Sequence, residues 1–418
     1  SSKQELMLRN LAVRREPSEF SFPPLKSITS IQQGLQDGQV VLAFFSVGKQ
    51  LDAYSVSKEK YSRWTIKSPP KVRRLTANLL RQMGNFDKNG QLTIDQLSDD
   101  NWKQTAAKLL KVLIPGVSAS VWDDYKELII VPDDFLWYLP FEALQVEQED
   151  ELRSLISKVR IRYVPTLSLV HPLESTPRPV RNFAVLTGKL DGREQDELGT
   201  QIAEEIMASS RGAFQVDPTN SIPSRYSAPF WEQLLVLKDI DTQKQLPYDW
   251  APVHKDRIKS NNTLRSWFKL PWGAPERIIM PGYHTAAEDA FKRQRKADGS
   301  EVFLAVCGMM STGAKTILLS RWRTGGQTAY DLVREFVQEL PFTSASDAWQ
   351  RSVQLTMHNE IDPSVEPRIR WKQGQELLSS HPPFFWAGPM LIDTGREIPV
   401  QDGRRNEDVQ PVKHVAPK

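Results

Sequence analysis

Three short apolar runs lie close together in the second half of the chain: RIIM at residues 277–280, VFLAV at 302–306 and TILLS at 316–320. Each run has the length of a buried strand. A short helix is predicted between the first two, over residues 288–296. Because consecutive buried strands joined by crossovers form parallel sheets, this stretch predicts an α/β fold with a mostly parallel sheet.

The same alternation continues on both sides of this stretch. Apolar spacing predicts a strand at 183–187, a helix at 196–209, helices at 327–340 and 344–357, and a closing apolar segment at 384–392. Residues 217–275 lose this periodicity and contain seven prolines, which predicts a long surface excursion.

The first part of the chain has a different pattern. Residues 40–47 and 51–57 predict a hairpin that turns at Gly48-Lys49, with residues 63–66 as a third strand. A helix is expected to end at Pro115, and the run at 127–131 predicts a buried strand. These elements predict an N-terminal lobe of the α+β type.

Proline clusters and polar ends divide the chain. The predicted parts are a lead-in segment at residues 1–25, the N-terminal lobe at 26–176, a second lobe at 177–396 and a disordered tail at 397–418. The boundary between the lobes falls at the three prolines between residues 172 and 179.

Composition excludes several classes of protein. The chain has 418 residues, 39% of them hydrophobic, and a single cysteine, so an internal disulfide, a four-cysteine zinc site and an iron–sulfur cluster are excluded. The 54 Lys and Arg residues nearly balance the 51 Asp and Glu residues, and nucleic acid is not the expected partner. No apolar run reaches the length of a membrane helix. We expect a cytoplasmic protein without membrane contact.

Two reactive side chains follow two of the predicted strands. His284 follows the run at 277–280 through Pro281-Gly282-Tyr283, and Cys307 follows the run at 302–306. If these strands are parallel neighbours, both side chains emerge at one edge of the sheet, where an imidazole can generate a thiolate. The alternative is that Cys307 is a small buried hydrophobe and His284 an ordinary loop residue. No HExxH-like spacing points to a metal site.

Four segments, in this order along the chain, resemble the CHAT family, a branch of the caspase-like (clan CD) cysteine peptidases. They are LIIVPDDFLWYLPFEAL at 128–144, FLAVCG at 303–308, GAKTILLSRW at 313–322 and HPPFFWAG at 381–388. The resemblance implies a caspase-like three-layer α/β/α fold for the second lobe.

The resemblance also implies an activity. His284 would be the base and Cys307 the nucleophile of a cysteine endopeptidase that works through an acyl-enzyme and needs no cofactor or metal. The backbone N–H groups of Thr285 and Cys307 would form the oxyanion hole. The implied partners are a protein or peptide substrate and an upstream repeat or sensor domain.

The sequence departs from the family near these residues. Thr285 stands where glycine is usual, the residues after Cys307 are neutral, and the helix expected between Cys307 and the next strand is missing. If Arg321 or Arg323 points into the crevice, an acidic or neutral residue before the scissile bond is favoured. Otherwise both arginines are solvated or pair with Asp331 and Glu335.

The competing class is a catalytically inactive caspase-like scaffold or partner-binding module. Geometry distinguishes the two classes. A sulfur within proton-transfer distance of the imidazole and open to solvent favours the enzyme, whereas a buried thiol that faces away favours the scaffold.

Overall fold

The structure is a computed structural model of the whole chain. It describes residues 25–85, 91–171, 182–190, 197–216, 223–240, 242, 247–253, 262–269, 274–291, 298–372 and 381–395. The predicted lead-in, lobe boundary and tail lie almost entirely outside these residues.

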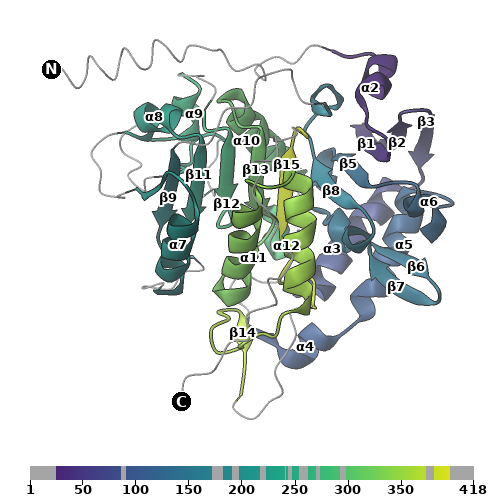
Figure 1. The fold of residues 1–418 in the computed structure, drawn as a ribbon. Helices are drawn as coiled ribbons and strands as arrows, with labels where there is room; N and C mark the ends of the chain where they lie inside the picture. Colours follow the sequence, from purple (N-terminus) through teal and green to yellow (C-terminus); the bar gives the residue numbers. More distant parts are fainter. Residues whose placement is uncertain are drawn as a thin grey trace.

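One sheet of eleven strands organises the described part of the chain (Figure 1). Its order is β10 (Ala213–Gln215), β9 (Phe183–Thr187), β11 (Gln233–Leu237), β12 (Arg277–Met280), β13 (Thr316–Ser320), β15 (Pro389–Asp393), β8 (Arg160–Tyr163), β5 (Glu127–Val131), β1 (Gln39–Val47), β2 (Gln50–Ser57) and β3 (Tyr61–Ile66). Neighbours are parallel except in the pairs β13–β15, β1–β2 and β2–β3. The predicted α/β fold with a mostly parallel sheet is confirmed.

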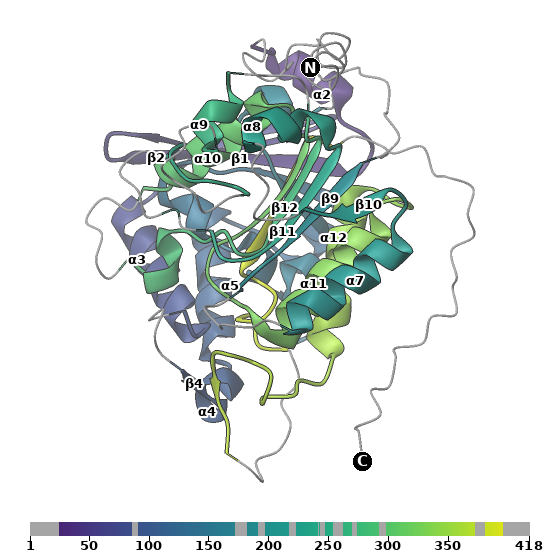
Figure 2. The same cartoon turned by 90° about the vertical axis from the view of Figure 1, so that its left-hand side faces the viewer.

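Helices cover both faces of this sheet, which gives three layers. Figure 2 shows α7 (Glu197–Ser209), α11 (Gly326–Glu339) and α12 (Ala345–His358) on one side of the strands, and α3 (Pro69–Gln82) and α10 (Ser300–Ser311) on the other. The helix α5 (Asn101–Leu113) packs against α3. The shorter elements are α2 (Ile28–Gly34), β4 (Leu92–Thr93), α4 (Ile94–Ser98), α6 (Ala119–Asp123), β6 (Gln145–Gln148), β7 (Glu151–Ser154), α8 (Ser224–Ser227), α9 (Leu264–Trp267) and β14 (Ile369–Arg370), with 3-10 turns between them.

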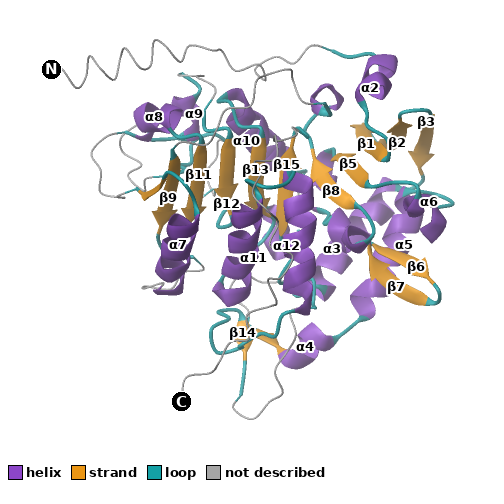
Figure 3. Cartoon of the chain, viewed as in Figure 1, coloured by secondary structure: helices purple, strands orange, loops and turns teal. Residues whose placement is uncertain are grey.

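The strands of the two predicted lobes belong to the same sheet (Figure 3). The predicted hairpin and third strand are confirmed as β1, β2 and β3, and β15 joins this part to the rest by pairing with β8 at Ile392 and Tyr163.

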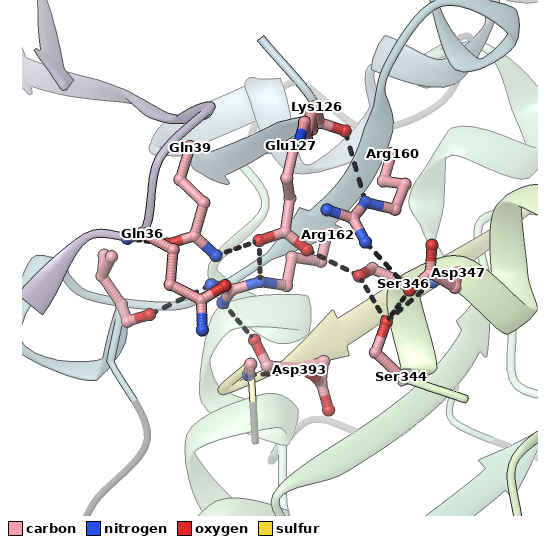
Figure 4. A network of polar contacts seen from close by, with 12 residues as sticks. Gln36, Gln39, Lys126, Glu127, Arg160, Arg162, Ser344, Ser346, Asp347 and Asp393 are labelled. Atoms are coloured by element: carbon pink, nitrogen blue, oxygen red, sulfur yellow. Dashed lines mark hydrogen bonds and ion pairs between the residues drawn. The ribbon is translucent and has the colours of Figure 1, made fainter. Parts of the chain in front are cut away.

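A buried polar network crosses this junction (Figure 4). Arg162 on β8 donates to the main-chain oxygens of Asp393, at 2.8 Å, and Val170, at 3.1 Å, and its Nε lies 3.4 Å from a carboxylate oxygen of Glu127. Gln39 and Ser346 also donate to Glu127. The network ties β1, β5, β8, β15 and α12 together where the two halves of the sheet meet.

Two predictions for individual elements were wrong. Residues 302–306 are not a strand but part of α10, whose buried residues Val302, Ala305, Val306 and Met309 recur at helical spacing. The aperiodic region at 217–275 contains β11, a fully buried central strand. The predicted helix at 288–296 begins as a 3-10 turn, Ala286–Asp289, and residues 292–296 lie outside the described part of the chain.

Candidate functional site

The carboxyl ends of β11, β12 and β13 meet at one edge of the sheet, because these strands are parallel neighbours. A tight turn follows β12. A Cβ on Gly282 would lie 2.0 Å from the main-chain oxygen of Lys238, so only glycine fits between the segments that follow β11 and β12. The main-chain N–H of Ile240 donates to Gly282 at 3.0 Å and fixes this approach. The turn delivers His284 to the edge of the sheet.

His284 is buried beside two charged side chains, of which one is buried and the other half-buried. Its Nε2 is 3.3 Å from a carboxylate oxygen of Glu288 and 3.4 Å from a guanidinium nitrogen of Arg323. Arg323 in turn lies 3.5 Å from Glu288. We call these three residues the His284 cluster. His284 and Arg323 are predicted site residues, whereas Glu288 is not among the predicted ones, although it stands four residues after the histidine.

Cys307 lies on a different kind of element from the one predicted. It occupies the third turn of α10, which is the crossover from β12 to β13. The sequence suggests no helix between Cys307 and the next strand because that helix already contains Cys307. Burial raises the pKa of Cys307 to about 11, and no hydrogen bond from the imidazole of a described histidine opposes this shift. Tyr248 and Phe268 lie beside the neighbouring Gly308, and Cys307 contributes to the raised pKa of Tyr248, for which burial is the main cause.

Both N–H groups predicted for the oxyanion hole are engaged elsewhere. The main-chain N–H of Thr285 donates to the main-chain oxygen of Arg321 at 3.1 Å, and the Thr285 hydroxyl donates to the same oxygen at 2.9 Å. The N–H of Cys307 lies inside an α-helix, where it donates to the carbonyl four residues earlier. Both donors already have main-chain partners, so an oxyanion hole at these residues stays a prediction that would require both hydrogen bonds to break.

The two arginines predicted for a substrate pocket have different environments. Arg321 is fully buried, lies 3.6 Å from Glu142 and donates to the main-chain oxygens of Ala387 and Pro389. It therefore connects β13 to the LPFE turn and does not enter a crevice. The side chain of Arg323 is 26% exposed and belongs to the His284 cluster.

The carboxylates expected as alternative partners of these arginines pair with a different arginine. Asp331 and Glu335 lie beside Arg334, at 3.0 and 3.5 Å.

The Glu142 carboxylate beside Arg321 is deeply buried. Burial raises the pKa of Glu142, although Arg321 and the Tyr163 hydroxyl both act to lower it. The Arg321–Glu142 pair is a structural link inside the core.

Two kinds of feature are absent from the described part of the chain: a cluster of metal ligands and a membrane-spanning helix. Its residues contain no group of three or more His, Cys, Asp or Glu side chains arranged to hold a metal ion. None of its helices combines the length and the apolar character that crossing a membrane requires.

Comparison with known proteins gives one family match. The CHAT domain family model matches residues 103–219, which include the LPFEAL segment and confirm the predicted resemblance over that range. The other three motifs lie outside the matched residues. No curated protein matches the sequence.

Solved structures with a similar fold include two of the Saccharomyces cerevisiae separase–securin complex. One has 8% sequence identity and a TM-score of 0.44, and the similarity covers 93% of this chain and 32% of that chain. The other has 8% identity and a TM-score of 0.42, covering 93% and 33%. The chain spans about a third of the length of these neighbours.

Proposed function

We propose that this chain is a caspase-like CHAT scaffold that binds other proteins and does not cleave peptides through Cys307. One observation carries the proposal: Cys307 lies within the α10 crossover, with a thiol pKa raised to about 11. The thiol is half-buried on a helix, and burial is the main cause of this shift.

Chemistry supports this conclusion. A cysteine nucleophile reacts as the thiolate, and a pKa of about 11 leaves roughly one thiol in ten thousand ionised at pH 7. Catalytic cysteines have the opposite shift, produced by a nearby cation or a helix N-terminus. Cys307 is in the third turn of its helix, away from that end.

The cysteine endopeptidase remains the competing hypothesis, because one contact favours it. The imidazole of His284 is held by the carboxylate of Glu288, and a carboxylate that orients an imidazole is typical of catalytic bases. The dyad would require α10 to shift so that the thiol of Cys307 meets His284 and exchanges its half-buried surroundings for charged ones.

A labelling and cleavage experiment separates these hypotheses. Wild type, Cys307→Ser and His284→Asn are incubated with a peptidyl epoxide and, separately, with a randomised peptide library at pH 7. We expect no epoxide adduct on the folded wild type and no cleavage product above the level of either variant. Urea-unfolded wild type, which exposes the same thiol, is the positive control for labelling. Cleavage by the wild type that both variants lose would refute the scaffold proposal.

A further inference from the structure

The helices α3 and α5 present exposed faces with cations and no anions. Lys71, Arg74 and Arg81 are exposed on α3, and Lys108 is exposed on α5. Neither helix contains an Asp or Glu residue. We call these four residues the basic face. None of them makes an ion pair with a residue that the structure describes, whereas Lys103 and Lys111 on α5 each have an acidic neighbour.

Helical spacing gathers these charges into one stripe on each helix. Lys71, Arg74 and Arg81 fall within about 100° of arc on α3 and span about 15 Å along its axis. On α5, the exposed Lys108 lies on the same stripe as the exposed Gln104 and Lys111. Because α3 and α5 pack against each other, the axes of the two helices lie about 10 Å apart. Uncompensated cations along one stripe repel, and an anionic partner removes that repulsion.

The composition of this surface decides between anionic partners. No large exposed hydrophobic side chain lies on α3 or α5, so neither helix has the apolar face that enters a membrane surface or the aromatic side chains that stack on single-stranded nucleic acid. Asp95, Asp99 and Asp100 stand just before α5 and would repel a phosphate backbone that continued past the patch. A short acidic segment, with carboxylates on one side of about three helical turns, matches the length of the α3 stripe.

We infer that the basic face of α3 and α5 binds an acidic segment of a partner protein. Carboxylates of the partner pair with Lys71, Arg74, Arg81 and Lys108, and the neutral Asn78 and Gln104 lie between them as hydrogen-bonding groups. This inference goes beyond the proposed function, because it holds whether or not Cys307 is catalytic.

The test uses a charge reversal of the full chain, Lys71→Glu/Arg74→Glu/Lys108→Glu. All three side chains are exposed, and glutamate is a good helix former, so the fold should be retained. The matched control, Lys49→Glu/Arg211→Glu/Arg370→Glu, makes the same change in net charge at exposed sites elsewhere. The probe is a fluorescent helical peptide of about 20 residues with glutamate at every third or fourth position, and its glutamine counterpart measures binding that is independent of charge.

Binding is measured by fluorescence anisotropy at low salt. We expect the glutamate peptide to bind wild type and the control variant with affinities within about twofold, and the charge-reversed variant at least about tenfold more weakly. The glutamine peptide should not bind, and salt should weaken the complex, since exposed charges are screened beyond about 10 Å at 0.1 M. Cys307→Ala should bind as wild type does, which separates this result from that of the labelling experiment.

Three outcomes would overturn the inference. The first is equal binding of the glutamate peptide by wild type and the charge-reversed variant. The second is an equal loss of binding in the control variant, which would show only the effect of net charge. The third is that wild type binds a duplex DNA of about 20 base pairs, or phosphatidylserine vesicles, more tightly than it binds the glutamate peptide, and that the charge reversal abolishes this binding. That result would assign the basic face to phosphate groups.

Discussion

Cys307 is the single cysteine of the chain, and its chemistry is set by the helix in which it lies. At the end of a strand, the thiol would sit among the loops at the edge of the sheet. On α10, the thiol is half-buried near Tyr248, and desolvation favours its protonated form. Identity and sequence spacing alone therefore did not determine whether this residue could act as a nucleophile.

The reactivity of this thiol with iodoacetamide provides a prediction. At pH 8, we expect folded wild type to react at least about tenfold more slowly than urea-unfolded protein, because the pKa of Cys307 is raised by burial to about 11. The rate of alkylation of the folded protein should keep rising with pH up to about pH 11. The rate for the unfolded protein should level off near the ordinary thiol pKa of about 8.5. Adduct formation is followed by intact mass, with Cys307→Ser as the blank.

The same shift has a consequence for stability. A raised pKa in the folded state means that folding favours the protonated thiol, so this contribution to stability is present below the ordinary thiol pKa and is lost as pH rises towards about 11.

A folded thiol that reacts with iodoacetamide faster than the unfolded one at pH 7–8 would contradict the alkylation prediction and would indicate an activated cysteine.

The elements show where sequence patterns are informative and where they are not. The hairpin β1–β2 consists of two strand-length runs that flank a glycine turn, and its predicted bounds are nearly correct. The run at 302–306 was assigned to a strand because a short apolar segment has the same pattern in a buried strand and a buried helix. The strand β11 was missed because proline-rich segments on both sides hid a run of only five residues. Tertiary packing decided both cases.

The junction between β8 and β15 provides a prediction at this scale. Arg162→Met should lower the free energy of unfolding by about 3–5 kcal/mol, because it leaves Glu127 as a buried charge and removes the donor to the main-chain oxygens of Asp393 and Val170. Arg160→Met, two residues away on the same strand, breaks the partly exposed ion pair with Asp347 and should cost about 0–1 kcal/mol. Urea denaturation measures both values.

The pH dependence and a second substitution test the cause of this loss. Burial raises the pKa of Glu127, but Arg162 and the Ser346 hydroxyl outweigh it and hold the pKa below its ordinary value. This contribution to stability is present above the ordinary pKa of 4.5 and is lost as pH falls through the folded pKa. The difference in the free energy of unfolding between wild type and Arg162→Met should therefore narrow below about pH 4.5. Adding Glu127→Gln to the Arg162→Met variant should restore part of the lost stability. Equal costs for Arg160→Met and Arg162→Met would show that the network contributes little.

At the scale of the whole molecule, the α/β class and the mostly parallel sheet could be predicted because buried strands and amphipathic helices alternate through the second half of the chain. The division into two lobes remains a prediction. It rested on local proline content, which indicates where a chain turns but not whether the strands before and after the turn pair with each other. The pairing of β8 with β15 depends on residues more than two hundred positions apart, and no local pattern could predict it.

This continuous sheet predicts a single cooperative unfolding transition. Two independent lobes would unfold at separate urea concentrations, whereas strands that share one sheet and the Glu127–Arg162 network should be lost together. Circular dichroism at 222 nm follows the helices of both halves, and fluorescence follows the tryptophans, which also occur in both. We expect the two midpoints to coincide in wild type and to shift together in Arg162→Met. Separate midpoints in wild type would support the two-lobe division, because they would mean that the junction at β8 and β15 does not couple the two halves of the sheet.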